Sequence, residues 1–122
     1  MLNANLVLLY VEDIPRSRQF YQDLLGAQPA ADFPAYVAFA FPSGLMLGLW
    51  PTTAANFVSG GTGNRSELAF MVEDVATVEA LHDQWQKAGV QIEQAPFDAL
   101  FGRTFVALDP DGHRIRVCKP NG

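Results

Sequence analysis

The feature that most constrains the fold of this chain is a pattern that occurs twice. The tripeptide Val-Glu-Asp stands at residues 11–13 and again at residues 72–74. Each copy follows a short apolar run, such as residues 6–11, and precedes a stretch whose apolar side chains have helical spacing. A glycine then ends each helical stretch, Gly26 in the first half and Gly89 in the second. Because the order of elements is the same in both halves, the sequence predicts a duplicated unit.

Three further strand patterns follow each predicted helix. In the first half they are separated by Pro34 and by the Pro-Ser-Gly turn at residues 42–44. In the second half, residues 95–102 fit no element clearly. The expected strands are residues 6–11, 30–33, 36–41 and 45–50 in the first half, and residues 67–72, 90–92, 103–108 and 114–118 in the second. Each half is therefore predicted to be a βαβββ module.

The stretch between the two halves, residues 51–65, is rich in small and polar residues and predicts a flexible connector. We expect a single domain of residues 1–122, with a first module at residues 1–50 and a second at residues 66–122. A chain of 122 residues with 49% hydrophobic content has enough material for a substantial core.

The composition excludes several classes of function. The net charge is −5 and the Lys and Arg residues form no basic stripe, which argues against a nucleic-acid partner. The sequence has no run of about 18 uncharged apolar residues, so we expect no membrane span. No signal peptide is evident, and the single cysteine, Cys118, cannot form an internal disulfide. We therefore expect a protein of the reducing cytoplasm.

The second half closes with the sequence Asp-Pro-Asp-Gly at residues 109–112, a strong reverse-turn signal because proline fixes φ and glycine accepts a positive φ. In the strand that follows, Ile115 and Val117 alternate with Arg114 and Arg116. Arg116 therefore points away from the apolar side of this strand. We expect it to face a ligand cleft.

Two motifs give the chain a family resemblance. They are the helix end Phe-Tyr-Gln-Asp-Leu-Leu-Gly at residues 20–26 and the turn Asp-Pro-Asp-Gly-His at residues 109–113. The chain resembles the vicinal oxygen chelate superfamily, which includes glyoxalase I, extradiol dioxygenases, fosfomycin-resistance proteins and bleomycin-binding proteins. The resemblance implies an α+β fold in which two βαβββ modules form a curved mixed sheet, an incomplete barrel, around a cleft. It also implies a homodimer.

The resemblance further implies where a metal would be bound, on the first and last strands of each module. The matching positions in this chain are Leu6, Gly48, Glu67 and Arg116. A divalent metal needs about three or four oxygen, nitrogen or sulfur donors. Leu6 and Gly48 offer none, and the fixed positive charge of Arg116 would repel the ion. Only Glu67 could bind a metal, so we expect neither a metal site nor any other cofactor.

If these positions converge, Glu67 and Arg116 face each other and could form a bidentate ion pair. Two interpretations remain open. The pair could be structural, in which case it need not add net stability. Alternatively, one partner could also hydrogen-bond a polar group of a ligand.

Aromatic side chains supply further candidates for ligand contact. Trp50 and Met46 share the strand face of Gly48 by alternation. On the preceding strand Tyr36 or Phe39 could point to the same side. Near the end of the chain, Phe101, Arg103 and Phe105 alternate and could form an aromatic–Arg–aromatic face. The predicted ligand-binding residues are Phe39, Met46, Trp50, Glu67, Phe101, Arg103 and Arg116.

The favoured function is a metal-free protein that binds a small aromatic molecule, similar to drug-sequestering proteins of the bleomycin-resistance type. The alternative is a metal-dependent lyase or isomerase of the glyoxalase type, or a dioxygenase-related enzyme, that uses other ligands. A third hypothesis, metal-free catalysis with Glu67 as base, is less favoured because Arg116 would lower the pKa of Glu67. We predict no catalytic residue, because His82 and His113 fit helix-packing and turn-stabilising roles.

Overall fold

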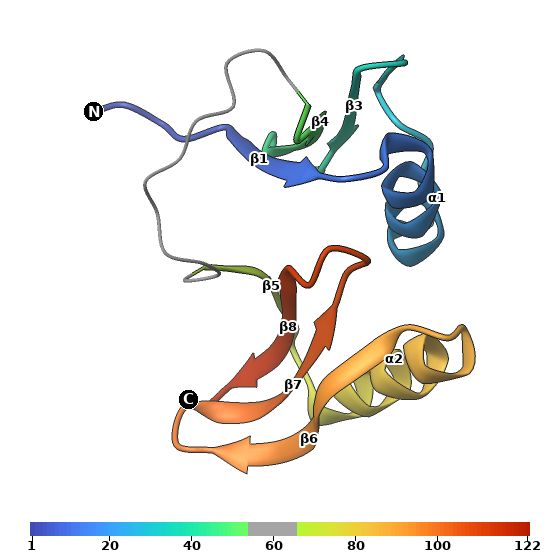
Figure 1. Ribbon diagram of the computed structural model, residues 1–122. Helices are drawn as coiled ribbons and strands as arrows, with labels where there is room; N and C mark the ends of the chain where they lie inside the picture. Colours follow the sequence, from blue (N-terminus) through green and yellow to red (C-terminus); the bar gives the residue numbers. More distant parts are fainter. Residues whose placement is uncertain (54–65) are drawn as a thin grey trace. The chain divides into compact units, whose positions relative to one another are not determined.

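The computed structural model describes residues 1–53 and 66–122 and divides the chain into two compact units, residues 1–60 and 61–122. Most of the predicted connector, residues 54–65, lies outside the described residues. Each unit has the predicted βαβββ order (Figure 1). The α+β fold of two such modules, built on mixed sheets that do not close, is thereby confirmed.

Unit 1 is a four-stranded sheet with one helix. Its elements are β1 (Leu6–Val11), α1 (Ile14–Leu25), β2 (Ala31–Phe33), β3 (Tyr36–Ala40) and β4 (Met46–Pro51). The strand order is β1-β4-β3-β2, with β1 parallel to β4 and the other pairs antiparallel. The crossover through α1 therefore places the first and last strands of the module side by side.

Unit 2 repeats this topology. Its elements are β5 (Glu67–Met71), α2 (Val75–Lys87), β6 (Gln91–Ala99), β7 (Gly102–Leu108) and β8 (Arg114–Pro120). The strand order is β5-β8-β7-β6, with β5 parallel to β8. Strand β6 is longer than the expected residues 90–92, because two register shifts let it pair with β7 past Pro96, which has no N–H to donate.

The predicted helix starts are confirmed by their capping geometry. Asp13 Oδ1 accepts a hydrogen bond from the Arg16 backbone N–H at 3.1 Å, and Asp74 Oδ1 accepts one from the Thr77 N–H at 2.7 Å. Gly26 ends α1 with a φ of 64°, the left-handed conformation that glycine adopts without steric cost. None of the described helices has the length and apolar character needed to cross a membrane.

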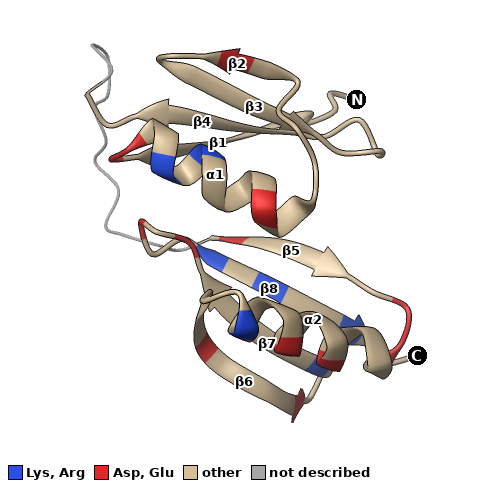
Figure 2. Cartoon of the chain, turned by 90° about the vertical axis from the view of Figure 1, so that its right-hand side faces the viewer, with Lys and Arg blue, Asp and Glu red and all other residues tan. Residues whose placement is uncertain are grey.

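Each helix covers one face of its own sheet, which we call the covered face. The Tyr21 ring of α1 lies 6.5 Å from the Phe39 ring of β3, and the Trp85 ring of α2 lies 5.4 Å from the Phe105 ring of β7. Fully or almost fully buried side chains of the covered faces are Val11, Val37, Phe39, Leu47 and Leu49 in unit 1, and Phe105, Ala107, Ile115 and Val117 in unit 2. The alternating side chains point to the opposite face, which we call the open face. Figure 2 marks the Lys and Arg positions along β8 in blue.

The turn between β7 and β8 is held by one buried carboxylate. Asp109 Oδ1 accepts hydrogen bonds from the backbone N–H groups of Asp111, at 2.9 Å, and His113, at 2.8 Å. Asp109 Oδ2 lies 2.7 Å from His113 Nδ1. The side-chain ligand atoms of these three residues lie within 4.8 Å of one another. Since both Asp109 oxygens already have partners, we interpret this cluster as a set of hydrogen bonds that stabilises the turn.

This turn predicts a pH dependence of stability. The hydrogen bond to Asp109 raises the pKa of His113 above its ordinary value of 6.5. The protonated imidazole therefore stabilises the fold fully below about pH 6.5, and this contribution is lost as the pH rises through the higher folded-state pKa. We expect the free energy of unfolding of the wild type, relative to His113→Gln, to be larger at pH 6 than at pH 9 by urea denaturation. An identical difference at both pH values would contradict this.

A second prediction concerns Gly102 at the start of β7. Its φ is 151°, and a Cβ there would overlap the Lys119 carbonyl oxygen and lie 2.9 Å from Pro120 Cα. Because both obstacles are backbone atoms, Gly102→Ala should lower the free energy of unfolding by about 3 kcal/mol or more. Gly26→Ala is the control, since a Cβ there meets nothing within 4 Å, and it should cost only about 1 kcal/mol. Equal losses in thermal or urea unfolding would disprove the clash.

Candidate functional site

The predicted ion pair forms on the open face of the unit 2 sheet. Arg116 of β8 reaches diagonally across the parallel ladder to Glu67 of β5. Its Nε lies 2.7 Å from Glu67 Oε1 and its Nη2 lies 3.0 Å from Oε2, a bidentate arrangement. The hydrogen bond from Arg116 lowers the pKa of Glu67, and the same bond raises the pKa of Arg116. Both groups are therefore charged near neutral pH.

Two further residues hold the Arg116 guanidinium in place. Thr104 Oγ1 accepts a hydrogen bond from Arg116 Nη1 at 3.0 Å and donates one to the Val117 carbonyl at 2.8 Å. The Phe101 ring lies against the guanidinium, with its centroid 5.4 Å from Cζ. Only 15% of the Arg116 side chain is exposed. The guanidinium is thus fixed by contacts to three neighbouring residues.

The same carboxylate has a second cation beside it. Arg114 Nε lies 3.0 Å from Glu67 Oε2, and its Nη1 lies 3.2 Å from Glu93 Oε1. Arg114 Nε is buried, and its contact with Oε2 is an ion pair without good hydrogen-bond geometry. Sequence reasoning did not select Arg114 or Thr104. The Arg-Ile-Arg alternation of β8 could have indicated Arg114, whereas Thr104 becomes recognisable only through strand pairing.

The residues at the metal positions implied by the family do not fit a divalent cation. Leu6 and Gly48 carry no donor atoms, and the space above Gly48 is taken by other side chains: a Cβ there would lie 2.9 Å from Leu8 Cδ1 and 3.1 Å from the Tyr36 hydroxyl oxygen. In unit 2 both oxygens of Glu67 are paired with Arg116. A cation at Glu67 would have to displace a permanently charged guanidinium.

Two of the predicted contact residues lie on the open face of the unit 1 sheet. Met46 and Trp50 alternate along β4 with the buried Leu47 and Leu49. The Trp50 ring is stacked on Tyr10, with centroids 6.0 Å apart and planes inclined by 23°. Trp50 and Met46 thus lie where the sequence predicted them, and their contact with a ligand stays a prediction.

Phe39 does not lie on the open face, so its selection as a ligand-binding residue was wrong. It is 1% exposed and packs against Tyr21 of α1 on the covered face. The register of β3 against β4 explains this, because Phe39 pairs with the buried Leu47. Tyr36, the alternative on the same strand, has its hydroxyl beside Gly48 and belongs to the open face.

The expected aromatic–Arg–aromatic face of residues 101–105 is also wrong. Arg103 lies on the covered face, where its Nε binds Glu79 Oε1 of α2 at 2.8 Å. Phe105 packs under α2 against Trp85. Phe101 lies in the turn before β7 begins at Gly102, so strand alternation does not extend to it, and it contacts Arg116 of the open face instead. Phe101 therefore remains a candidate and Arg103 does not.

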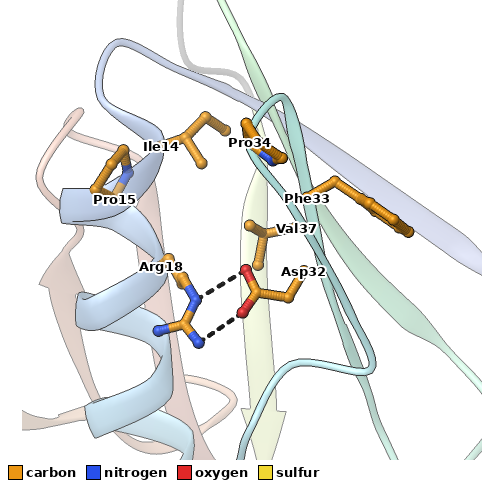
Figure 3. A pocket seen from close by; sticks show the side chains of 7 residues that line it. All are labelled: Ile14, Pro15, Arg18, Asp32, Phe33, Pro34 and Val37. Carbon is orange, nitrogen blue, oxygen red and sulfur yellow. Dashed lines mark hydrogen bonds and ion pairs between the residues drawn. The ribbon is translucent and has the colours of Figure 1, made fainter.

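A groove in unit 1 lies away from these residues, between the start of α1 and β2 (Figure 3). Arg18 spans it with a bidentate ion pair to Asp32, at 3.1 Å from Nε and 2.8 Å from Nη2. Apolar side chains, including the exposed Phe33, form its rim. The groove contains none of the predicted ligand-binding residues, and the ion pair ties α1 to β2.

Comparison with known proteins identifies relatives that match nearly the full length of this chain. A model of the Glyoxalase/Bleomycin resistance protein/Dioxygenase superfamily matches residues 3–117. The Phenazine antibiotic resistance protein EhpR of Enterobacter agglomerans is 32% identical over 126 residues, which cover 96% of this chain and 92% of the relative.

Two solved structures are similar in fold. A protein of Agrobacterium tumefaciens, studied by solution NMR, is 39% identical with a TM-score of 0.88, and both chains are covered completely. A glyoxalase/bleomycin resistance protein/dioxygenase family enzyme of Burkholderia phytofirmans is 22% identical with a TM-score of 0.81, covering 96% of this chain and 98% of the other. The latter supports the fold alone. Together with the family match, these findings confirm the predicted relationship: the chain belongs to the glyoxalase, bleomycin resistance protein and dioxygenase superfamily.

Proposed function

We propose that this protein is a metal-free binding protein for a flat aromatic molecule and that it confers resistance by sequestering that molecule. The observation that carries the proposal is the chemistry of the four family metal positions. Two of them, Leu6 and Gly48, have no donor atoms, and the other two form the Glu67–Arg116 ion pair. These side chains suit contact with an organic ligand better than coordination of a metal ion.

The relative EhpR supports a phenazine as the ligand class. A phenazine is a planar, three-ring aromatic system, which binds well to side chains that offer a flat surface. The open faces provide such surfaces at Trp50, which is stacked on Tyr10, and at Phe101, which is 51% exposed. Met46 adds an adaptable apolar contact beside Trp50 on the same strand face.

We include a homodimer and a cytoplasmic location in the proposal. The described sheets have β1, β2, β5 and β6 as edge strands, and edges with exposed apolar side chains favour association with a second copy. Large exposed apolar side chains on these edge strands are Leu6, Val7, Phe33, Met71 and Phe97. The buried, unpaired thiol of Cys118 fits a reducing compartment.

Binding can be tested by isothermal titration of phenazine into the wild type and Trp50→Ala. Because Trp50 supplies a stacking surface, we expect its removal to weaken binding about tenfold or more. Quenching of tryptophan fluorescence should follow the same saturation curve in the wild type and be reduced in Trp50→Ala. Val75→Ala, an exposed position on α2, is the matched control and should bind as the wild type does. The proposal fails if no member of a panel of flat aromatic compounds gives a saturable signal.

Because the residues at the four family metal positions do not fit a divalent cation, we expect the protein, purified without chelator, to contain far less than one equivalent of metal. Elemental analysis by mass spectrometry should therefore find Ni, Zn, Mn and Fe at trace levels. One equivalent of any of these ions would overturn the binding-protein proposal and favour the glyoxalase-type alternative. Loss of that metal in Glu67→Gln would identify the coordinating carboxylate.

A further inference from the structure

We propose that the open face of unit 2 selects ligands that carry a carboxylate next to the aromatic ring, and that Arg116 is the specificity-determining residue. This inference rests on the proposed function and adds the charge of the ligand to it. The recognising group is the guanidinium that Glu67, Thr104 and Phe101 hold in place. The ligand class is an aromatic acid, such as a phenazine carboxylate.

The hydrogen-bonding capacity of Arg116 is not exhausted by its protein partners. A guanidinium has five N–H donors. Glu67 accepts from Nε and Nη2, and Thr104 accepts from Nη1, which accounts for three of them. One N–H on each terminal nitrogen remains, and a carboxylate oxygen is a strong acceptor for such a charged donor. Arg116 can therefore bind an anionic group while it remains paired with Glu67.

The carboxylate of Glu67 is already paired with cations of the protein. Glu67 has two guanidinium groups within 3.0 Å, those of Arg114 and Arg116, so its negative charge is already compensated. The nearby Glu93 interacts with Arg114 at the longer distance of 3.2 Å. The buried Nε of Arg114 has no well-directed hydrogen bond. An anionic ligand at Arg116 would therefore meet a carboxylate whose charge is already compensated by two guanidinium groups.

An aromatic surface lies directly beside the cation. Phe101 contacts the Arg116 guanidinium and leaves half of its own surface exposed. Phe97 of β6 pairs with Thr104 of β7 and is 40% exposed. A ring that rests on these side chains would bring its substituent close to Arg116. This combination of exposed aromatic rings and a fixed cation is complementary to an aromatic acid.

The fold itself does not require the ion pair. Unit 1 has the same strand order as unit 2, yet its corresponding positions are Leu6 and Gly48. A partly buried ion pair need not add net stability, since desolvation offsets the attraction between the charges. The charged pair in unit 2 is therefore better explained by a ligand than by the needs of the sheet.

The test compares two probes that differ by one carboxylate group, phenazine and phenazine-1-carboxylate, by isothermal titration at pH 7. The wild type should bind the carboxylate about tenfold more tightly than phenazine, the effect of a charge-assisted hydrogen-bonded pair. In Arg116→Met the two probes should bind equally, because the group that distinguishes them is gone. Arg116→Lys, which keeps the charge but not the planar donor pair, should retain part of the preference. Arg103→Met removes an ion-paired arginine from the covered face of the same sheet and should keep the full preference.

The double variant Glu67→Gln/Arg116→Met guards against misfolding, because it leaves no buried charge unpaired, and circular dichroism checks its fold. It should also bind both probes equally. If the wild type binds both probes equally, or if Arg116→Met keeps the preference, the role of Arg116 is disproved while the proposed function stands. If the wild type binds neither probe nor any other flat aromatic compound, both proposals fall together.

Discussion

The structure depends on one constraint, that each four-stranded sheet has a single helix to cover it. Successive side chains of a strand point to opposite faces, so a helix on one side leaves the other face without cover from its own unit. In unit 1 the covered face holds Phe39 and Leu47 against Tyr21, and in unit 2 it holds Phe105 against Trp85. On the open faces, Trp50 and Arg116 remain partly exposed.

The two units show how duplicated modules can differ while the scaffold is kept. Both place their first and last strands side by side in parallel, so the same positions meet on the open face of each. In unit 1 these positions are apolar, and Leu8 and Tyr36 fill the space above Gly48. In unit 2 they are charged, and Arg116 neutralises Glu67. The buried side chains of the covered faces stay apolar in both units, because each sheet must pack against its helix.

Much of the architecture could be predicted from local signals. The caps at Asp13 and Asp74 and the glycine at the end of α1 are effects of single residues on nearby backbone groups, so they can be read without knowledge of the fold. The Glu67–Arg116 contact could also be anticipated, because it depends only on the positions of two residues within a known topology. Strand β6 was not predicted in full, since its bulges depend on pairing with β7.

The sequence by itself determined the order of elements, the duplication and the lack of donor atoms at Leu6 and Gly48, because these follow from residue type and local spacing. Only the tertiary structure decided which side of a sheet each candidate occupies. Phe39 and Arg103 fall on the covered faces, because register and the position of the helix fix the direction of a whole strand. The three residues that contact the Arg116 side chain also come from different parts of the chain. They are Glu67 of β5, Thr104 of β7 and Phe101 of the turn before β7. Contacts between segments distant in the chain have no local signature, so folding alone brings them together.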